Sequence, residues 1–204
     1  DVQHFRFWPQ FRSFLLWEME REYSEEKRRA LFSRGALYYE LKEDYAHALE
    51  CYTRCGDHAK VSELLIRNAE LHPGMGHYSE MEKYYRSLPE AEIAASPALM
   101  QGMSMLCALA MDYEGSERWY HELQEFGKRC GRGDAAGKQA RSRLAWLDIS
   151  LPQRGVEGLT ETIPAVFRLM TNKEVSLPSF SVTSALPSVM NGGKDFSVWS
   201  KRDD

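Results

Sequence analysis

A glycine pair followed by lysine, Gly192-Gly193-Lys194, is the first feature of the sequence that could do chemistry. A phosphate-binding loop requires Gly, four further residues and then Gly-Lys-Ser or Gly-Lys-Thr, so that backbone amides and a hydroxyl reach phosphate and Mg²⁺. Here Asp195 follows the lysine, and Ser188 stands where the first glycine is required. The motif is therefore incomplete, and we interpret the glycine pair as a turn with positive φ.

Metal ligation is a second possibility, because Cys51 and Cys55 lie one helical turn apart. Zinc sites usually pair cysteines across two intervening residues and add a second pair downstream, which this sequence lacks. The histidines are scattered, without the His-Glu-x-x-His spacing that places two imidazoles on one helical face. We therefore predict reduced core thiols at both cysteines, no metal site and no cofactor in this chain.

Nucleophilic catalysis would require an activated serine or cysteine. No Gly-x-Ser-x-Gly elbow is present, and Cys130 lies in the basic run from Lys128 to Arg132, a setting that can lower a thiol pKa. The same run is also typical of a helix end, where cations favour the carbonyl dipole and Gly131 caps the helix. We favour the helix end, and because no acid, base and nucleophile come together we predict that the chain is not an enzyme.

The strongest charge bias of the sequence begins at the same run. DNA contact is one interpretation of it, but interleaved aromatics and a recognition helix are missing. A solvated turn, or a patch for an acidic partner or an anionic effector, is the interpretation we favour. The cations are Lys128, Arg129, Arg132, Lys138, Arg141 and Arg143, against Asp134 alone.

The composition sets limits on the protein class. The chain has 204 residues, 43% hydrophobic and 27% charged, with a formal net charge of −4, which is enough apolar sequence for a packed core and unlike a phosphate-backbone binder. The longest apolar stretch, Ala98 to Tyr113, contains Gln101 and Asp112 and is too short to span a bilayer. Because no signal peptide is evident and the first residue is Asp1, we expect a cytoplasmic fragment of a longer protein without membrane contact.

Helices are predicted from Ser24 to Thr171, because apolar residues recur every three or four positions between Gly, Pro and Asp breaks. Ser24 and Asp57 precede such stretches as N-caps. The predicted helices cover 24–41, 45–55, 58–71, 77–87, 97–112, 115–130, 134–150 and 155–171.

These helices fit a repeat of about 34 residues, the helix-turn-helix unit of tetratricopeptide proteins, in which small residues lie where two helices cross. Ala48, Met81 and Ser116 occupy equivalent positions at nearly this spacing. We predict an all-α fold, a right-handed superhelix of stacked helical hairpins with an irregular C-terminal segment. An irregular all-α domain, in which these are ordinary core residues, is the alternative.

In a superhelix of this kind the first helix of each pair lines the concave side. A mixed polar and apolar lining suits a peptide, a protein segment or a small effector, although the same residues could instead be merely exposed or pack on the next repeat. The lining residues in this register are Ser33, Leu37, Glu40, Glu63, Ile66, Gln101 and Met105.

The two ends of the chain differ from the helical part. Residues 4–17 are rich in aromatics, and we predict a strand end followed by a short helix that begins at Pro9. Residues 173–204 lose helical periodicity but retain Phe180, Phe196 and Trp199, so we expect an irregular segment that docks on a surface.

The run from His4 to Leu16, HFRFWPQFRSFLL, resembles the end of the winged-helix arm in MalT-like, LuxR-type, ATP-dependent transcriptional regulators. In that family a Phe-x-x-Phe-Leu run leads into helical repeats, and Trp8 stands where members often carry His. The sequence Cys55-Gly-Asp57 is similar to the continuation of the family, as are Tyr38, Ala46, Ala48 and Leu64-Leu65. The run from Pro187 to Phe196 is similar to a segment between repeats in some members.

The resemblance implies a modular regulator with a nucleotide-binding switch, a winged-helix arm, a superhelical sensor and a C-terminal DNA-binding domain. It implies that 1–22 end the arm, 23–172 form the tetratricopeptide-like repeat domain and 173–204 are the irregular segment. ATP would then bind upstream and DNA downstream, while this region binds a protein partner or a small effector. A general scaffold for protein–protein interaction is the alternative.

Overall fold

The computed structural model describes residues 7–71, 78–131, 133–151, 153 and 155–171, and the elements within these ranges are α-helices, without a strand. The all-α prediction is therefore confirmed for the described residues. None of their helices is long and apolar enough to cross a membrane. The predicted irregular segment at 173–204, with its glycine pair and three aromatics, lies outside the described residues. Contacts divide the chain into two compact units, unit 1 (1–61) and unit 2 (62–204), which we describe separately.

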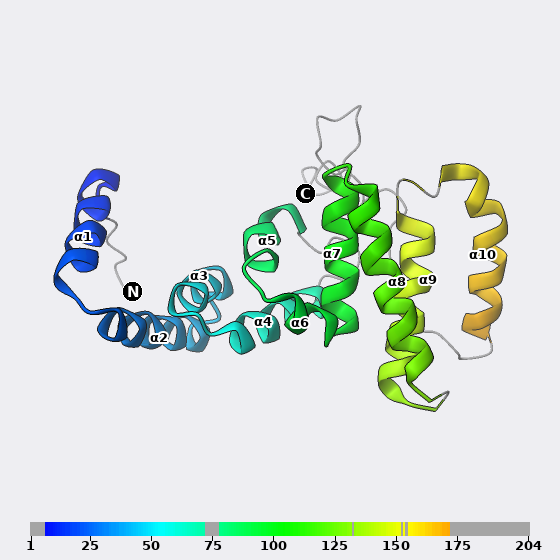
Figure 1. Ribbon diagram of the computed structural model, residues 1–204, viewed down its shortest axis with the longest axis horizontal. Helices are drawn as coiled ribbons and strands as arrows, with labels where there is room; N and C mark the ends of the chain where they lie inside the picture. The colour runs from blue at the N-terminus through cyan, green and yellow to red at the C-terminus, as the bar shows by residue number, and fades with distance from the viewer. Residues whose placement is uncertain (1–6, 72–77, 132, 152, 154, 172–204) are drawn as a thin grey trace, which may run out of the picture. The chain divides into compact units, whose positions relative to one another are not determined.

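Unit 1 contains α1 (Pro9–Glu22), α2 (Glu25–Leu41), α3 (Tyr45–Cys55) and the first turn of α4 (His58–Leu71) (Figure 1). Local signals set these bounds. Ser24 caps α2 by accepting a hydrogen bond from the Lys27 amide, and Asp44 caps α3 by accepting one from the His47 amide. Gly56 ends α3 with a φ of +75°, a left-handed conformation that favours glycine.

The α2/α3 hairpin is held together by small residues. Ala36 of α2 and Ala48 of α3 are completely buried, and an added Cβ on Gly35 would lie 3.6 Å from the Cys51 sulfur. Side chains of this size let the two helix axes approach closely. The predicted crossing position at Ala48 is therefore buried as expected.

In its described part, unit 2 contains the rest of α4 and six further helices, of which α7, α8 and α9 pack on one another and α10 packs on α9 (Figure 1). The short helices α5 and α6 pack on α7. The six are α5 (Tyr78–Tyr85), α6 (Glu90–Ala94), α7 (Pro97–Leu109), α8 (Tyr113–Arg129), α9 (Ala135–Ser150) and α10 (Gly155–Thr171).

Helix α7 is the core of unit 2, because twelve of its thirteen residues are buried. Ser104 and Ser116, both completely buried, place their hydroxyl oxygens 3.2 Å apart where α7 crosses α8. Ser104 also donates to the Ser116 carbonyl oxygen at 3.0 Å, so neither polar group is buried without a partner. Gly102 allows the Tyr85 ring of α5 to lie against the backbone of α7, where any Cβ would overlap the phenol.

The α2/α3 and α7/α8 hairpins have the same turn. Glu43 and Met111 each have a φ near +60°, and each is followed by an aspartate that caps the next helix. Asp44 and Asp112 have nearly identical backbone angles, φ −87° and ψ 74° against φ −85° and ψ 77°. The offset between the two aspartates is twice the repeat length of about 34 residues.

Most predicted helix bounds lie within one helical turn of the observed ones, and the differences have local causes. Helix α1 begins at Pro9 as expected but is 14 residues long, so it exceeds the short helix predicted, and Phe7 and Trp8 before it are not in a strand. Helix α6 was not predicted; it begins after Pro89 with Glu90 and Glu92 in its first turn. The predicted start at 115 is too late, because Asp112 caps α8 by accepting from the Gly115 amide.

Candidate functional site: a cavity in the N-terminal helical hairpin

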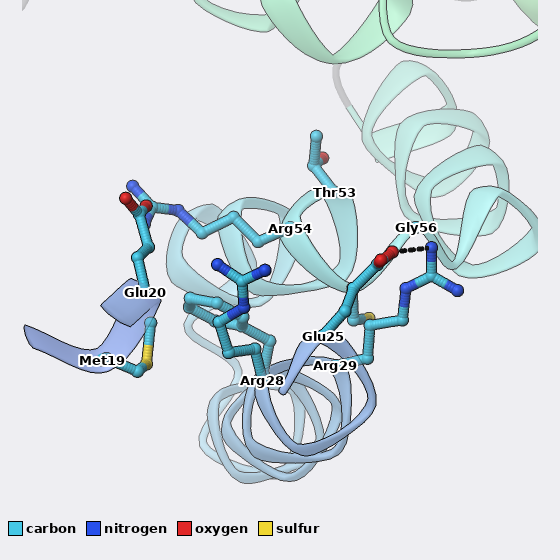
Figure 2. Close-up of a pocket in the computed structure, with 10 residues that line it drawn as sticks. Met19, Glu20, Glu25, Arg28, Arg29, Thr53, Arg54 and Gly56 are labelled. Carbon is cyan, nitrogen blue, oxygen red and sulfur yellow. Dashed lines mark hydrogen bonds and ion pairs between the residues drawn. The ribbon is translucent and has the colours of Figure 1, made fainter. Parts of the chain in front are cut away.

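Five charged side chains line a single hollow in unit 1, a cavity of about 360 Å³. Helix α2 contributes Glu25, Arg28, Arg29 and Phe32, whose spacing of three and four positions places them on one face of the helix. The other walls are Met19 and Glu20 of α1 and the C-terminal turn of α3, from Thr53 to Gly56 (Figure 2).

Two of the three guanidinium groups in the cavity are already paired. Arg29 donates to Glu25 at 2.5 Å, and Arg54 donates to Glu50 at 2.9 Å. The Arg54 guanidinium also lies 5.4 Å from the centre of the Phe32 ring, in a cation–π contact. These contacts hold both arginines against the wall of the cavity.

The other two charged side chains of the lining, Arg28 and Glu20, form no ion pair within 4.0 Å to any residue of the described chain. Arg28 is half-buried, whereas Glu20 is exposed. The Thr53 hydroxyl of the same lining is buried and has no hydrogen-bond partner. Unpaired polar groups of both signs, beside the apolar side chains of Phe32 and Met19, suit the binding of a small polar molecule.

A second, wider hollow of about 600 Å³ adjoins the first and shares Arg29, Cys55 and Gly56 with it. It continues along α2 to Ser33 and reaches the start of α4 at His58. Ser33, one of the residues predicted to line a binding surface, therefore lies in this hollow of unit 1.

Leu37 and Glu40, also predicted as lining residues, lie further along α2. Leu37 is 54% exposed. Glu40 accepts hydrogen bonds from the Tyr52 hydroxyl at 2.5 Å and from Lys60 at 3.2 Å, so it ties α3 and the first turn of α4 to α2. Burial and this carboxylate raise the pKa of Tyr52 to about 12, which keeps the phenol protonated as the donor.

The four remaining predicted residues belong to unit 2, and two of them are not on a surface. Glu63 is exposed and Ile66 is half-buried on α4. Gln101 and Met105 are 5% and 0% exposed.

The prediction that Gln101 and Met105 line an accessible surface needs correction, because α9 packs on the same face of α7. Gln101 accepts a hydrogen bond from Arg143 of α9 at 2.6 Å, and the Ser150 hydroxyl of α9 lies 3.8 Å from the Met105 sulfur. The alternative, in which these residues pack on the next helical pair, describes this part of the chain.

A further hollow of about 440 Å³ lies between α8, α9 and α10 of unit 2. Its walls are mainly apolar, with Leu144, Val166 and Leu169, and Tyr120 donates to Asp148 at 2.7 Å on one side. It carries no unpaired charge comparable to that of Arg28 among the described residues.

Three cations of the charge-biased run make different contacts. Lys128 pairs with Glu125 at 2.7 Å, and Arg129 lies 6.0 Å from the Phe126 ring centre. Arg143 turns inward to Gln101, and burial lowers its pKa. Arg132 lies outside the described residues.

The cysteines form no disulfide or metal cluster in the part of the chain that the structure describes. All four are free thiols, and no group of three His, Cys, Asp or Glu side chains there could hold a metal ion. Burial raises the pKa of Cys51 and of Cys107, with a smaller contribution from Glu50 and Asp112 respectively, so both favour the neutral thiol.

Sequence reasoning missed the cavity residues Arg28, Arg54, Glu20 and Thr53. The spacing of Glu25, Arg28 and Arg29 on one helical face was a usable signal. No comparable signal predicted that α1 contributes to the cavity, because its contribution depends on how the chain turns between α1 and α2.

No protein-family model, curated protein or solved structure matches this chain. Its function is therefore inferred from its own residues and geometry.

Proposed function

We propose that the chain is the helical-repeat sensor and interaction region of a MalT-like, LuxR-type transcriptional regulator, with no catalysis of its own. In this proposal α1 ends the winged-helix arm and the later helices form a tetratricopeptide-like superhelix that binds an effector or a protein partner. ATP binding and DNA binding belong to separate domains of the full-length protein.

The observation that supports the proposal best is the exposed aromatic face of α1. A ladder of aromatic rings with centroids 5.4–6.4 Å apart is formed by Phe11, Phe14 and Trp17 of the helix and by Phe7 just before its start, and each ring is about half exposed or more. Helix α1 has no buried residue. Exposed apolar surface of this extent usually marks an interface. The family resemblance implies this order along the chain: a helix whose aromatic face is covered by the rest of the arm, followed by a helical hairpin.

The correspondence between the two hairpin turns supports the repeat part of the proposal. Two copies of one turn at twice the expected period are typical of a repeat array. In such an array, binding acts by differential affinity: a ligand shifts the resting assembly toward the active one only as far as its affinities for the two states differ.

The proposal is tested by sequencing the gene that encodes this chain and by a transcription assay with its full-length product. We expect a phosphate loop encoded upstream of Asp1, a helix-turn-helix domain encoded downstream of Asp204, and loss of promoter activation when Phe11, Phe14 and Trp17 are replaced by Ser. Neighbouring sequence without either domain would contradict the proposal.

A general protein–protein interaction scaffold is the second candidate, and the outer face of α10 favours it. Ile163, Phe167 and Met170 are 38%, 62% and 37% exposed at intervals of four and three positions, which forms an apolar stripe on one side of the helix. A scaffold would retain its partners without ATP or DNA, so partner capture that is unaffected by deleting the upstream and downstream domains would favour this candidate.

A further inference from the structure

We propose that the cavity between α1, α2 and α3 binds a free α-amino acid with an apolar side chain. The lining of this cavity contains one unpaired cation, one unpaired anion and an apolar wall, and this combination matches the three parts of such a molecule. The inference does not depend on the regulator assignment, because it uses only the contacts within unit 1.

The unpaired charges decide the class of ligand. Arg29 and Arg54 are compensated by Glu25 and Glu50, whereas Arg28 and Glu20 line the same cavity without an ion pair to each other or to another described residue. In the view of Figure 2 the Arg28 side chain lies between Glu20 of α1 and Glu25 of α2. A molecule between Arg28 and Glu20 that carries both a carboxylate and an ammonium group pairs with both residues.

Ligands with a single kind of charge fit less well. A phosphate or a simple carboxylate would pair with Arg28 but would be repelled by Glu20, and an amine would pair with Glu20 but would be repelled by Arg28. A neutral apolar molecule would leave both charges unpaired. The zwitterion is the class for which every charged group of the lining has a partner.

The rest of the lining suits the remainder of the ligand. Phe32 and Met19 offer an apolar wall, and the unpartnered Thr53 hydroxyl offers a hydrogen bond. A volume of about 360 Å³ is at the small end of ligand pockets, which favours a single amino acid over a peptide.

The experiment is isothermal titration calorimetry of the 204-residue chain with L-leucine and L-methionine. We expect saturable binding tighter than about 1 mM for at least one of them. Two leucine analogues separate the charges: leucinamide lacks the carboxylate, and isocaproate lacks the ammonium group. Each should bind at least about tenfold more weakly than leucine, because each loses a charge-assisted hydrogen bond.

Variants then assign each charge to its residue. Arg28→Gln and Glu20→Gln should each weaken leucine binding by about tenfold or more. In Arg28→Gln, leucine and leucinamide should bind equally, because the partner of the carboxylate is gone. Arg34→Gln is the matched control: Arg34 is an exposed arginine on the same helix, donates to the Ala30 carbonyl oxygen and lies outside the cavity, so binding should be unchanged.

Helical circular dichroism checks that each variant is folded. Failure of both leucine and methionine to bind would overturn the proposal, as would equal binding of leucine and leucinamide by the unmodified chain. Inorganic phosphate that binds more tightly than leucine would also overturn it and would show an anion site instead.

Discussion

Helices α2 and α7 occupy equivalent places in hairpins with the same turn, yet one face is exposed in α2 and buried in α7. Ser33 and Leu37 of α2 correspond, at the offset of the two turns, to Gln101 and Met105 of α7. Leu37 is 54% exposed, whereas Met105 is completely buried. The hairpin itself does not decide the burial of this face; the neighbouring helix does, since α9 covers it in unit 2.

The two hairpins are alike, by contrast, in the small buried residues at the positions where their helices pack on each other. Ala36 and Ala48 of the first hairpin correspond, at the same offset, to Ser104 and Ser116 of the second, and all four are completely buried. The small size of the side chain is therefore what both crossings share. The serine pair is tolerated because its hydroxyls bond to each other and to the backbone.

The largest expected effect on stability is at Met105. Met105→Ala removes a completely buried side chain between α7 and α9, so we expect a loss of about 2–5 kcal/mol in the free energy of unfolding of unit 2. Urea denaturation followed by circular dichroism measures it. A loss below about 0.5 kcal/mol would show that α9 does not cover this face in solution, and the contrast with α2 would disappear.

Overpacking the crossing in the first hairpin should have the next largest effect. Ala48→Leu introduces three carbons at a completely buried position of a helix that packs on α2, and overpacking of this kind costs about 1–3 kcal/mol. Ala46→Leu, at an exposed position of the same helix, is the control and should leave the unfolding midpoint unchanged. Equal midpoints for Ala48→Leu and the parent would show that Ala48 is not at a close crossing.

The repeat pattern was sufficient to predict that Ala48 is buried, and caps at Ser24 and Asp57 were sufficient to place helix starts, because both signals are local. The prediction for Gln101 and Met105 was wrong because it required knowing which helix packs on α7, and the partners on α9 are distant in the chain. The charged cavity was missed for a related reason. Glu20 and Arg54 come from different helices, and no spacing along the chain relates them.

The third expected effect is smaller and depends on pH. Tyr52→Phe removes the hydroxyl that donates to Glu40, and we expect a loss of about 1.5 kcal/mol at pH 7, because Glu40 still accepts from Lys60. The pKa of Tyr52 rises from 10.0 to about 12 on folding, so its contribution is complete below pH 10 and is lost as the pH rises from about 10 to about 12.

Urea denaturation between pH 8 and pH 12 should therefore show a steeper fall in stability for the parent than for Tyr52→Phe. Tyr78→Phe in unit 2 is the matched comparison for the effect of burial, because burial raises the pKa of Tyr78 to about 12 without a contribution from an acid. Identical pH profiles for the parent and Tyr52→Phe would show that neither burial nor the Glu40 hydrogen bond raises the pKa of Tyr52.

The smallest expected effect is at Leu37, the counterpart of Met105. Leu37→Ala shortens a side chain that is already more than half exposed, so the free energy of unfolding should change by less than about 0.5 kcal/mol. The same urea titration used for Met105→Ala measures it, and the two variants remove similar apolar bulk from equivalent positions. A ratio of at least about fourfold between their effects would show that the neighbouring helix, rather than the repeat position, determines burial. A Leu37→Ala loss as large as that of Met105→Ala would mean that this face of α2 is covered in solution, and Leu37 would then be a packing residue rather than part of a binding surface.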